Sequence, residues 1–456
     1  MVTIRKSDGD EKCIVVIGAQ WGNEGKGKLA HRLCETADVC TRFNGGANNI
    51  HTISVDTKGQ YFVGRPMGEV ANAKSVATLG LFPLGVTKSD CQIVFGNGMV
   101  LHLATLAREI CDIQASIDPN VLERTFISTR AHIVFDFHQS VDGLFDDLRD
   151  NRLGTTQMGV GPAYSTKTIR NGLRMGDLFS ERLVIKEKIA ELVHYFAQYS
   201  EFDASRVDVD KIVDEHLKIL EVLRPCIVDT VALMANFLSS GKRIVCEGSN
   251  SVMSDLDFGT YPYVTSSNTT PGSACIGLGI PPTKISKVVG VCKSYTTRAQ
   301  HWFPSVLSSD DPAAVHLVKA GFEVGTKSKR ARRVGWLDLV QLKWASEISG
   351  FDSLMLTKLD ALSGLPRIGL VTGYKNFDVT EAGYPSTDEE FKGIESEIEF
   401  MPGWAASVAT AASRSELPKE AQAFLRRVEE FVGVKIEYIQ LGSEHTVLSQ
   451  RDIIQA

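Results

Sequence analysis

Residues 14–28, with the sequence IVVIGAQWGNEGKGK, join an apolar run of mostly β-branched residues to a glycine-rich turn. The apolar run predicts a buried strand, and the pattern that begins at Leu29 predicts a helix directly after the turn. Glycines allow backbone N–H groups to converge on one point, and a helix N-terminus attracts anions. The glycines of the turn are Gly22, Gly25 and Gly27, and its lysines are Lys26 and Lys28. The stretch therefore predicts a polyphosphate site between the strand and the helix.

The spacing of this turn differs from that of the usual P-loop. Gly27 stands where a serine or threonine would hold Mg²⁺ in that motif. Glycine-rich turns are also common in proteins without any ligand. A surface turn with solvated lysines is therefore the alternative to a polyphosphate site.

The composition indicates a large soluble protein. A chain of 456 residues exceeds the usual size of one hydrophobic core, which predicts one large domain with insertions or two domains in close contact. The net charge of −6 gives no reason to expect nucleic-acid binding, and no stretch has the roughly 20 apolar residues of a membrane span. Nine cysteines without CxxC pairs indicate reduced thiols. Residues 1–12 predict a disordered lead-in without a targeting signal, so we expect a cytoplasmic protein.

His51 lies in a polar loop between two predicted strands. Residues 39–43 predict the first strand, residues 44–52 the loop, and residues 53–55 the second strand. Catalytic residues are frequent on such loops, so His51 is a candidate for chemistry. A histidine bonded to a neighbouring backbone group is the alternative.

Three further segments are candidates for the site or for its support. Residues 154–162 form a second glycine-rich loop, whose threonine hydroxyls and backbone donors suit a phosphate. Residues 258–279 are polar and almost uncharged, which predicts a long binding loop. Residues 180–240 have apolar residues at helical spacing and predict a helical insert. We also expect strands within 91–100, 126–136, 243–248 and 288–291, a helix within 101–110, and a helix followed by a strand within 422–439.

A basic run and a short motif follow towards the C-terminus. In residues 327–333 the side chains are mostly Lys and Arg, which indicates either a solvated face or an anion site. Residues 354–360 predict a strand that ends in Thr-Lys-Leu-Asp. Lys358 can lie on a purine ring while Asp360 accepts hydrogen bonds from N1 and N2 of guanine. Adenine has no matching donors, so the motif favours guanine.

These motifs, in this order, resemble those of the adenylosuccinate synthetase family. The resemblance extends from about Ile14 to the C-terminus, and over residues 126–143 it is closer to the eukaryotic branch than to the bacterial one. The most specific matching segments are residues 20–22, 24–28, 130–132, 259–270, 335–338, 357–360 and 401–404.

The resemblance implies an α/β fold and a reaction. The fold is a single domain over residues 13–456, with a large, mostly parallel central sheet, a P-loop-NTPase-like nucleotide site, a helical insert at 180–240 and smaller accessory subdomains. Family members are ligases of purine nucleotide biosynthesis: GTP phosphorylates O6 of IMP, and the amine of L-aspartate then displaces that phosphate to give adenylosuccinate. The resemblance also implies one Mg²⁺ per subunit, a homodimer, and no nucleic-acid or membrane partner.

The resemblance also assigns roles to single residues. His51 matches the catalytic histidine, Asn23 stands at the position of the catalytic base, and Arg170 matches an arginine that reaches the IMP phosphate of the neighbouring subunit. The positions that match GTP-binding residues are Gly22, Asn23, Glu24, Gly25, Lys26, Gly27, Lys28, Ile50, His51, Thr52, Arg332, Lys358, Leu359, Asp360, Leu441, Gly442 and Ser443. Those that match IMP-binding residues are Asn23, Lys26, Asn48, His51, Thr156, Arg170, Asn250, Thr265 and Arg330. The aspartate positions are Lys327, Ser328, Lys329, Arg330 and Arg332, and the metal positions are Asn23 and Ile50.

Four departures from the family pattern fall at the site. Asn23 replaces the aspartate that acts as the base, and an amide cannot take a proton at neutral pH although its oxygen can bind a metal. Ile50 replaces a glycine whose carbonyl binds Mg²⁺. Residues 327–329 (Lys-Ser-Lys) replace Thr-Thr-Gly, and residues 299–302 (Ala-Gln-His-Trp) replace a glycine-rich segment that is one residue longer.

Three readings of the function remain open at this point. The first is a working adenylosuccinate synthetase with a weakened or relocated base. The second is a catalytically impaired paralogue that binds nucleotide and dimerises, and the third is a ligase for another purine or another amine donor. The clustered departures favour the second and third readings, whereas the retained His51, Lys26, Lys358 and Asp360 favour the first. We take the first as the best single statement of function.

Overall fold

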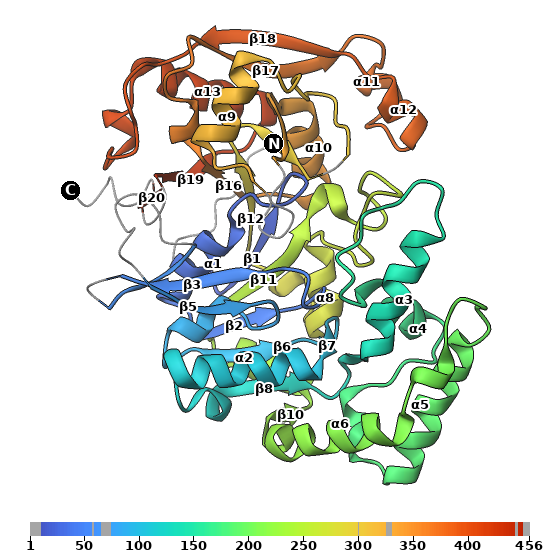
Figure 1. Cartoon of the computed structure of the whole chain (residues 1–456). Helices are drawn as coiled ribbons and strands as arrows, with labels where there is room; N and C mark the ends of the chain where they lie inside the picture. The colour runs from blue at the N-terminus through green and yellow to red at the C-terminus, as the bar shows by residue number, and fades with distance from the viewer. Residues whose placement is uncertain are drawn as a thin grey trace.

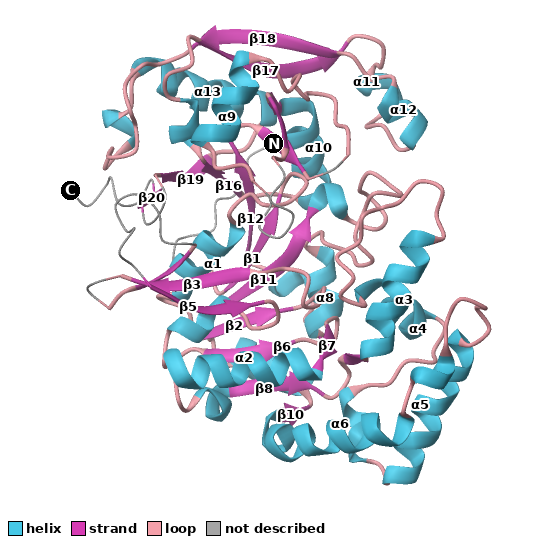
Figure 2. Cartoon of the chain, in the orientation of Figure 1, coloured by secondary structure: helices cyan, strands magenta, loops and turns pink. Residues whose placement is uncertain are grey.

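The computed structural model describes residues 11–56, 59–64, 74–299, 301–324, 331–442 and 446–449. Within these residues a ten-stranded sheet forms the centre of the molecule (Figures 1 and 2). In spatial order its strands are β10 (Ile227–Val228), β8 (Thr125–Ser128), β6 (Gln92–Phe95), β2 (Val39–Arg42), β11 (Ile244–Ser251), β1 (Cys13–Gly18), β12 (Lys287–Lys293), β16 (Ser353–Thr357), β19 (Ile436–Leu441) and β20 (Thr446–Ser449). Neighbouring strands are parallel except for β20, which runs antiparallel to β19. The predicted α/β fold with a large, mostly parallel sheet is confirmed.

β1 lies in the middle of this sheet, and all of its residues are buried. Ile14 and Val16 belong to the apolar cluster on one face, together with Leu29 of α1 (Lys26–Cys34). Val15 and Ile17 belong to the cluster on the other face. A parallel strand covered on both faces needs apolar residues at every position, which explains the uninterrupted apolar run that precedes the turn.

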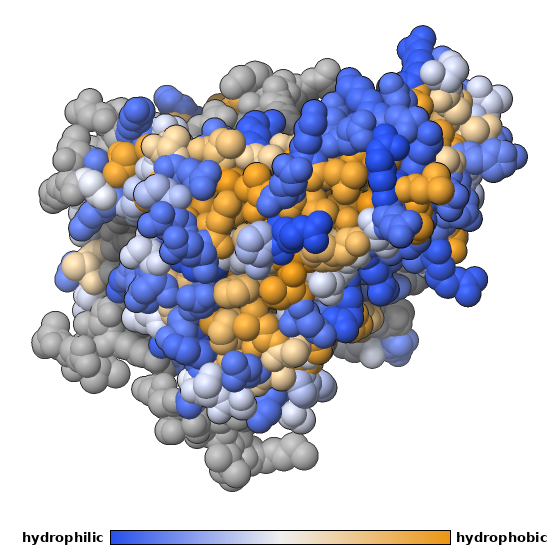
Figure 3. All heavy atoms as spheres, turned by 90° about the horizontal axis from the view of Figure 1, so that it is seen from below, coloured by the Kyte–Doolittle hydropathy of each residue, from blue (hydrophilic) through white to orange (hydrophobic). Residues whose placement is uncertain are grey.

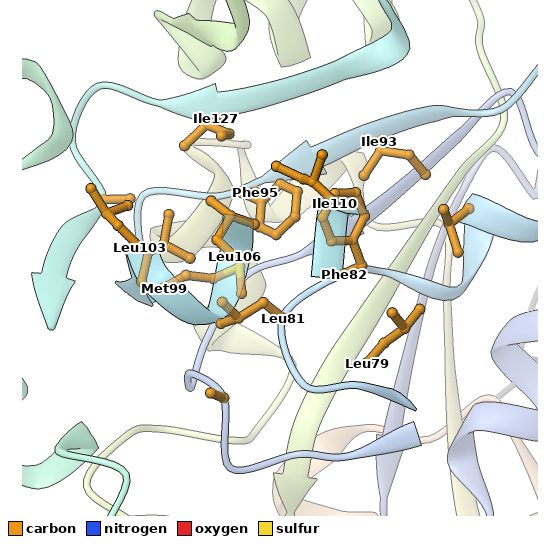
Figure 4. Close-up of a cluster of buried hydrophobic side chains, with 14 of the residues drawn as sticks. Leu79, Leu81, Phe82, Ile93, Phe95, Met99, Leu103, Leu106, Ile110 and Ile127 are labelled. Atoms are coloured by element: carbon orange, nitrogen blue, oxygen red, sulfur yellow. The ribbon is translucent and has the colours of Figure 1, made fainter. Parts of the chain in front are cut away.

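Helices cover both faces of the sheet. On the face of α1, Leu106 and Ile110 of α2 (Leu103–Ser116) pack near Phe82 and Phe95 (Figure 4), whose rings meet edge to face with centroids 5.0 Å apart. The cluster on the opposite face contains residues of five helices. They are α7 (Thr230–Ser239), α8 (Gly272–Leu278), α9 (Pro312–Ala320), α10 (Leu339–Ser349) and α13 (Lys419–Val432). No helix in the described part of the chain is long and apolar enough to cross a membrane.

Smaller elements surround the central sheet (Figure 1). The three-stranded sheets are β4 (Tyr61–Val63), β3 (His51–Val55) and β5 (Lys74–Leu79), and β15 (Leu337–Asp338), β17 (Arg367–Tyr374) and β18 (Ser396–Pro402). Two-stranded pairs join β7 (Val100–His102) to β9 (His132–Val134) and β13 (Thr296–Arg298) to β14 (Arg333–Gly335). The remaining helices are α3 (Asp136–Asp147), α4 (Val160–Thr168), α5 (Arg182–Phe196), α6 (Val209–Leu223), α11 (Val379–Ala382) and α12 (Asp388–Lys392). Residues 180–240 thus contain α5, α6 and α7, and β10 between the last two helices pairs with β8.

Three local predictions are wrong. The segment 258–279 is not a loop throughout, because α8 occupies its last part and buries Ala274 and Leu278. His51 and Thr52 are the first residues of β3, since their backbone pairs with β5. The helix expected at 101–110 begins only at Leu103, because the preceding residues pair with β9 as β7. In each case a tertiary contact overrides the local pattern. The predicted lead-in at 1–12 lies mostly outside the described residues.

α8 packs directly against the loop that follows β2. A Cβ atom built on Gly277 would lie 2.0 Å from the carbonyl oxygen of Phe43, which is far inside van der Waals contact. Gly272, at the start of the same helix, has no heavy atom within 4 Å of such a Cβ. The two glycines therefore separate the effect of a close approach from that of helix propensity.

Gly277→Ala should lower the free energy of unfolding by about 1–3 kcal/mol, because the new methyl group forces α8 away from Phe43. Gly272→Ala is the matched control and should cost nothing, since alanine is the better helix former. Urea denaturation of the three proteins measures both effects. Equal stability of Gly277→Ala and the unmodified protein would contradict this account of the packing.

Candidate functional site

The glycine-rich turn after β1 is built around the carboxylate of Glu24. Its Oε1 accepts hydrogen bonds from the backbone N–H groups of Gln20 (3.2 Å) and Gly22 (2.7 Å), and its Oε2 accepts one from Nζ of Lys26 (3.0 Å). Burial alone would raise the pKa of Glu24, but the charge of Lys26 and the hydrogen bonds outweigh burial and lower it. Glu24 therefore stabilises the turn from inside.

Lys26 is buried within the turn. Besides Glu24, its ammonium donates to Oγ of Ser251 (3.2 Å), at the end of β11. An ammonium has three donors, so one remains for a ligand oxygen. The alternative reading of a surface turn with solvated lysines is thus wrong for Lys26, whereas Lys28 is only half-buried.

The structure brings His51 directly against this turn. A Cβ atom on Gly27 would lie 2.7 Å from Nδ1 of His51, so no serine or threonine side chain fits where a usual P-loop has one. On the other side of the ring, Nε2 of His51 lies 2.8 Å from Oε1 of buried Glu247. Oε2 of Glu247 accepts a hydrogen bond from the backbone of Leu84 (3.0 Å), which fixes the carboxylate. His51 is thus held between a carboxylate and the phosphate turn.

The side chain of Asn23 faces an arginine. Asn23 is exposed and has a left-handed backbone (φ 59°), and its Oδ1 accepts a hydrogen bond from Nη2 of Arg332 (3.3 Å). Nη1 of Arg332 donates to Oε2 of Glu323 (2.8 Å). Burial opposes the charge of Glu323, but Lys293 and Arg332 outweigh burial and lower its pKa to about 2. A buried, ionised carboxylate therefore fixes the arginine that reaches Asn23.

The predicted IMP positions lie on three loops. Asn48 is half-buried after β2, Thr156 is exposed before α4, and Thr265 is half-buried in the loop after β11. The second glycine-rich loop is fixed by Asp146 of α3, whose carboxylate accepts hydrogen bonds from the N–H groups of Leu153, Gly154 and Thr155. These N–H groups therefore bind a carboxylate rather than a phosphate, which corrects the prediction for that part of the loop.

Two further IMP candidates have left-handed backbones. Asn250 has φ 63°, and its Nδ2 is buried without a hydrogen-bond partner among the described residues. A buried donor without a partner costs free energy, so a ligand acceptor is expected there. Arg170 has φ 67° and is exposed just after α4, where its side chain makes no hydrogen bond or ion pair with another described residue.

The Thr-Lys-Leu-Asp motif, which is predicted to bind guanine, lies at the end of β16. Oγ1 of Thr357 donates to the carbonyl of Glu24 (2.6 Å), which joins the end of β16 to the phosphate turn. Lys358 has a left-handed backbone (φ 63°), and its carbonyl accepts a hydrogen bond from Ser294 (2.8 Å). Oδ1 of Asp360 is buried without a hydrogen-bond partner among the described residues. The carboxylate is thus free to accept from a ligand donor.

Several predicted contacts cannot involve the side chain. Leu359 and Leu441 are buried in the apolar cluster, so only their backbone can reach a nucleotide. Gly442 has φ 65° and accepts a hydrogen bond from Nε2 of Gln440. The side chain of Ile50 is apolar, so its polar groups are only the backbone N–H and carbonyl, and the residue is 42% exposed. The predicted residues Lys327, Ser328, Lys329, Arg330 and Ser443 lie outside the described residues.

Sequence reasoning missed the two carboxylates that fix the site. Glu247 directly follows the apolar residues 244–246 in a buried strand, and a carboxylate at the end of such a run was a signal that could have been used. Glu323 lies just before the basic run and had no such signal. Their partners, His51 and Arg332, lie on other elements, so only the fold reveals the pairing.

The residues present can hold a magnesium ion only together with a charged ligand. In the described part of the chain, no group of three or more His, Cys, Asp or Glu side chains is arranged to hold a metal. The carboxylate of Glu24 faces inward, which leaves the neutral oxygens of Asn23 and Ile50. Mg²⁺ commonly binds with few protein ligands, water and substrate phosphates. The site fits Mg²⁺ when a nucleotide supplies the negative charge.

The fold and the site define a class of protein: an α/β enzyme with a nucleotide-phosphate turn at the carboxyl ends of parallel strands. The model of the adenylosuccinate synthetase family matches residues 15–448. Adenylosuccinate synthetase 1 of Laccaria bicolor is 40% identical over 443 residues, covering 97% of this chain and 99% of that protein. The adenylosuccinate synthetase of Trichoplax adhaerens is 39% identical over 449 residues and 97% of both chains.

A solved structure agrees with these sequence matches. The fully ligated adenylosuccinate synthetase of Plasmodium falciparum superimposes with a TM-score of 0.84 at 35% identity, over 96% of this chain and all of that one. The chain belongs to the adenylosuccinate synthetase family, which consists of ligases of purine biosynthesis.

Proposed function

We propose that this protein is a GTP-dependent ligase that joins IMP and L-aspartate to adenylosuccinate, with release of GDP and phosphate. The observation that supports this best is the contact of His51 with the phosphate turn. The imidazole lies against Gly27 on one side and against Glu247 on the other, so its ring is fixed beside the turn that is proposed to bind the γ-phosphate. We also propose a single domain over residues 13–456 and a cytoplasmic location.

The first step is the attack of O6 of IMP on the γ-phosphate of GTP. The N1 proton must leave so that O6 becomes nucleophilic, and Asn23 cannot accept it. Because Asn23 is exposed, solvent water takes the proton, and GDP leaves as O6 bonds to the γ-phosphorus. Lys26 and the turn N–H groups that Glu24 does not bind stabilise the charge of the transferring phosphoryl group. Nε2 of His51 is held by Glu247, so His51 would contact the same group through Nδ1, on the side of Gly27. Glu24 cannot replace the base, because its carboxylate is bound to Lys26 inside the turn.

In the second step the amine of aspartate attacks C6 and expels the phosphate. Arg332, fixed by Glu323, supplies a cation for a carboxylate of aspartate, as do the predicted positions Lys327, Lys329 and Arg330, whereas the predicted position Ser328 would supply a hydroxyl. Asn23 and Ile50 would hold Mg²⁺ through Oδ1 and the backbone carbonyl. The ion would neutralise charge on the GTP phosphates.

The guanine assignment is tested at Asp360. Asp360→Asn should weaken GTP binding by about 10- to 100-fold, because the carboxylate accepts hydrogen bonds from both N1 and N2 of guanine. ITP lacks the 2-amino group and should lose less affinity than GTP. Isothermal titration calorimetry with GTP, ITP and ATP measures these differences. If the unmodified protein binds ATP as tightly as GTP, the guanine assignment is wrong.

The missing base is tested by Asn23→Asp. A positioned base typically contributes about 10²- to 10⁴-fold, and we expect the lower end here. Arg332 lies 3.3 Å from Oδ1, so it would pair with the new carboxylate and make it a weaker base. Steady-state rates with IMP, GTP, Mg²⁺ and aspartate measure the gain. Asn236→Asp makes the same change on the exposed surface of α7 and should leave the rate unchanged.

The result also separates the three readings of the function. A fast unmodified enzyme that gains nothing from Asn23→Asp would show that another group acts as the base. Inactivity of both proteins would support the paralogue that binds nucleotide without the ligase step. Activity only with another purine or amine would support altered specificity.

We also propose a homodimer in which Arg170 reaches the IMP phosphate of the neighbouring subunit. Arg170 is exposed, and it lies beside Ile169, which is 43% exposed. Apolar side chains also gather on the face seen in Figure 3, and large apolar patches are frequent at protein interfaces. Sedimentation with IMP should show a dimer, and Arg170→Ala should weaken IMP binding. A monomer at micromolar protein with IMP present would contradict this arrangement.

A further inference from the structure

The segment that replaces the glycine-rich family pattern at 299–302 places an imidazole between two loops. The ring of His301 stacks on the ring of Tyr263, with centroids 3.9 Å apart and an interplanar angle of 29°. Nε2 of His301 lies 3.1 Å from the carbonyl oxygen of Leu153. A carbonyl only accepts, so Nε2 carries the proton and donates it. One side chain thus contacts two segments that lie far apart in the sequence.

Both contacted loops contain a threonine predicted to bind IMP. Tyr263 lies just before Thr265, and Leu153 lies just before the exposed Thr156. The distance between the two threonines depends on how the loops are held relative to each other. His301 links the loops through one stacking contact and one hydrogen bond, at the segments that carry those threonines.

Arg298 fixes the segment that contains His301. Its Nη1 donates to the carbonyl of Trp302 (2.6 Å), and its Nη2 donates to Oγ1 of Thr260 (2.8 Å) and to the carbonyl of Tyr263 (3.3 Å). Burial lowers the pKa of Arg298 to about 10, so the guanidinium remains charged at neutral pH. These bonds attach the segment of His301 to the loop of Tyr263.

The stacked pair also borders open space. Tyr263, His301, Trp302 and Arg298 line a cavity of about 110 Å³ together with residues of α12. The cavity leaves space beside the two loops. Without the imidazole, the loops of Tyr263 and Leu153 can therefore shift relative to each other. Loss of the link is therefore expected to change the distance between Thr156 and Thr265.

We propose that His301 is a positioning residue for the nucleoside monophosphate site, which it organises by joining the loops of Thr156 and Thr265. The inference rests on the proposed function, because these threonines are predicted to bind the IMP that this function uses.

The test compares IMP and GTP binding of His301 variants by calorimetry. His301→Ala removes both interactions and should weaken IMP binding by about tenfold, with GTP binding changed less than about twofold. His301→Phe keeps a ring for Tyr263 and His301→Gln keeps a donor for Leu153, so each should restore part of the loss. Thermal unfolding of each variant reports on stability separately.

His216 offers a matched control. Its Nδ1 lies 2.7 Å from the carbonyl of Ile212, and its ring centroid lies 5.0 Å from that of Phe135, so it makes the same two kinds of contact on α6. His216→Ala should leave IMP affinity unchanged whatever it does to the unfolding temperature. If His301 had only a structural role, His301→Ala and His216→Ala would have the same effect on IMP affinity.

The possible outcomes are distinct. Selective loss of IMP affinity in His301→Ala, with partial recovery in the conservative variants, supports the inference. Equal loss for IMP and GTP, or unchanged IMP binding, overturns it while leaving the proposed function intact. If the unmodified protein does not bind IMP at all, the proposed function fails and the inference fails with it.

Discussion

The carboxylate of Glu24 determines the shape of the phosphate turn on which the rest of the site depends. It faces inward from the end of β1 and accepts two backbone hydrogen bonds and one from Lys26. A buried carboxylate without such partners would be costly, so the pair holds the turn and its lysine in one arrangement. The side chain of Asn23 is left exposed on the outer side of the turn. The position of Lys26 is therefore set by the fold before any ligand binds.

The strand order of the parallel sheet places the remaining loops of the site next to this turn. β1, β2, β11, β12 and β16 are neighbours, and all of them run in the same direction. Their carboxyl ends meet at one edge, where ligands of open α/β sheets usually bind. The loop of His51, the loop of Thr265, the segment of His301 and the motif of Lys358 each follow one of these strands or the element after it. The site thus results from strand order.

The predicted departures from the family pattern lie at the proposed site, and the structure gives two of these residues defined contacts. Asn23 is bound by Arg332, whose guanidinium is itself fixed by Glu323. His301 links two loops through contacts that a glycine-rich segment cannot make. Both replacements are therefore integrated into hydrogen-bonded and packed surroundings. The proposed function predicts that they change the proton acceptor and the connection between loops, while the sheet remains that of the family.

The sequence by itself determined the features that are local. The apolar run of β1, the glycine-rich turn and the Thr-Lys-Leu-Asp motif are contiguous, so their periodicity and residue types were sufficient to predict them. Tertiary structure decided which distant groups meet. Glu247 behind His51, Glu323 behind Arg332 and Leu153 against His301 join separate elements, and no local pattern records such a contact. The helix α8, made largely of small residues, became recognisable only by its packing against Phe43. Contacts between residues far apart in the chain follow from strand order and side-chain packing, which exist only once the chain is folded.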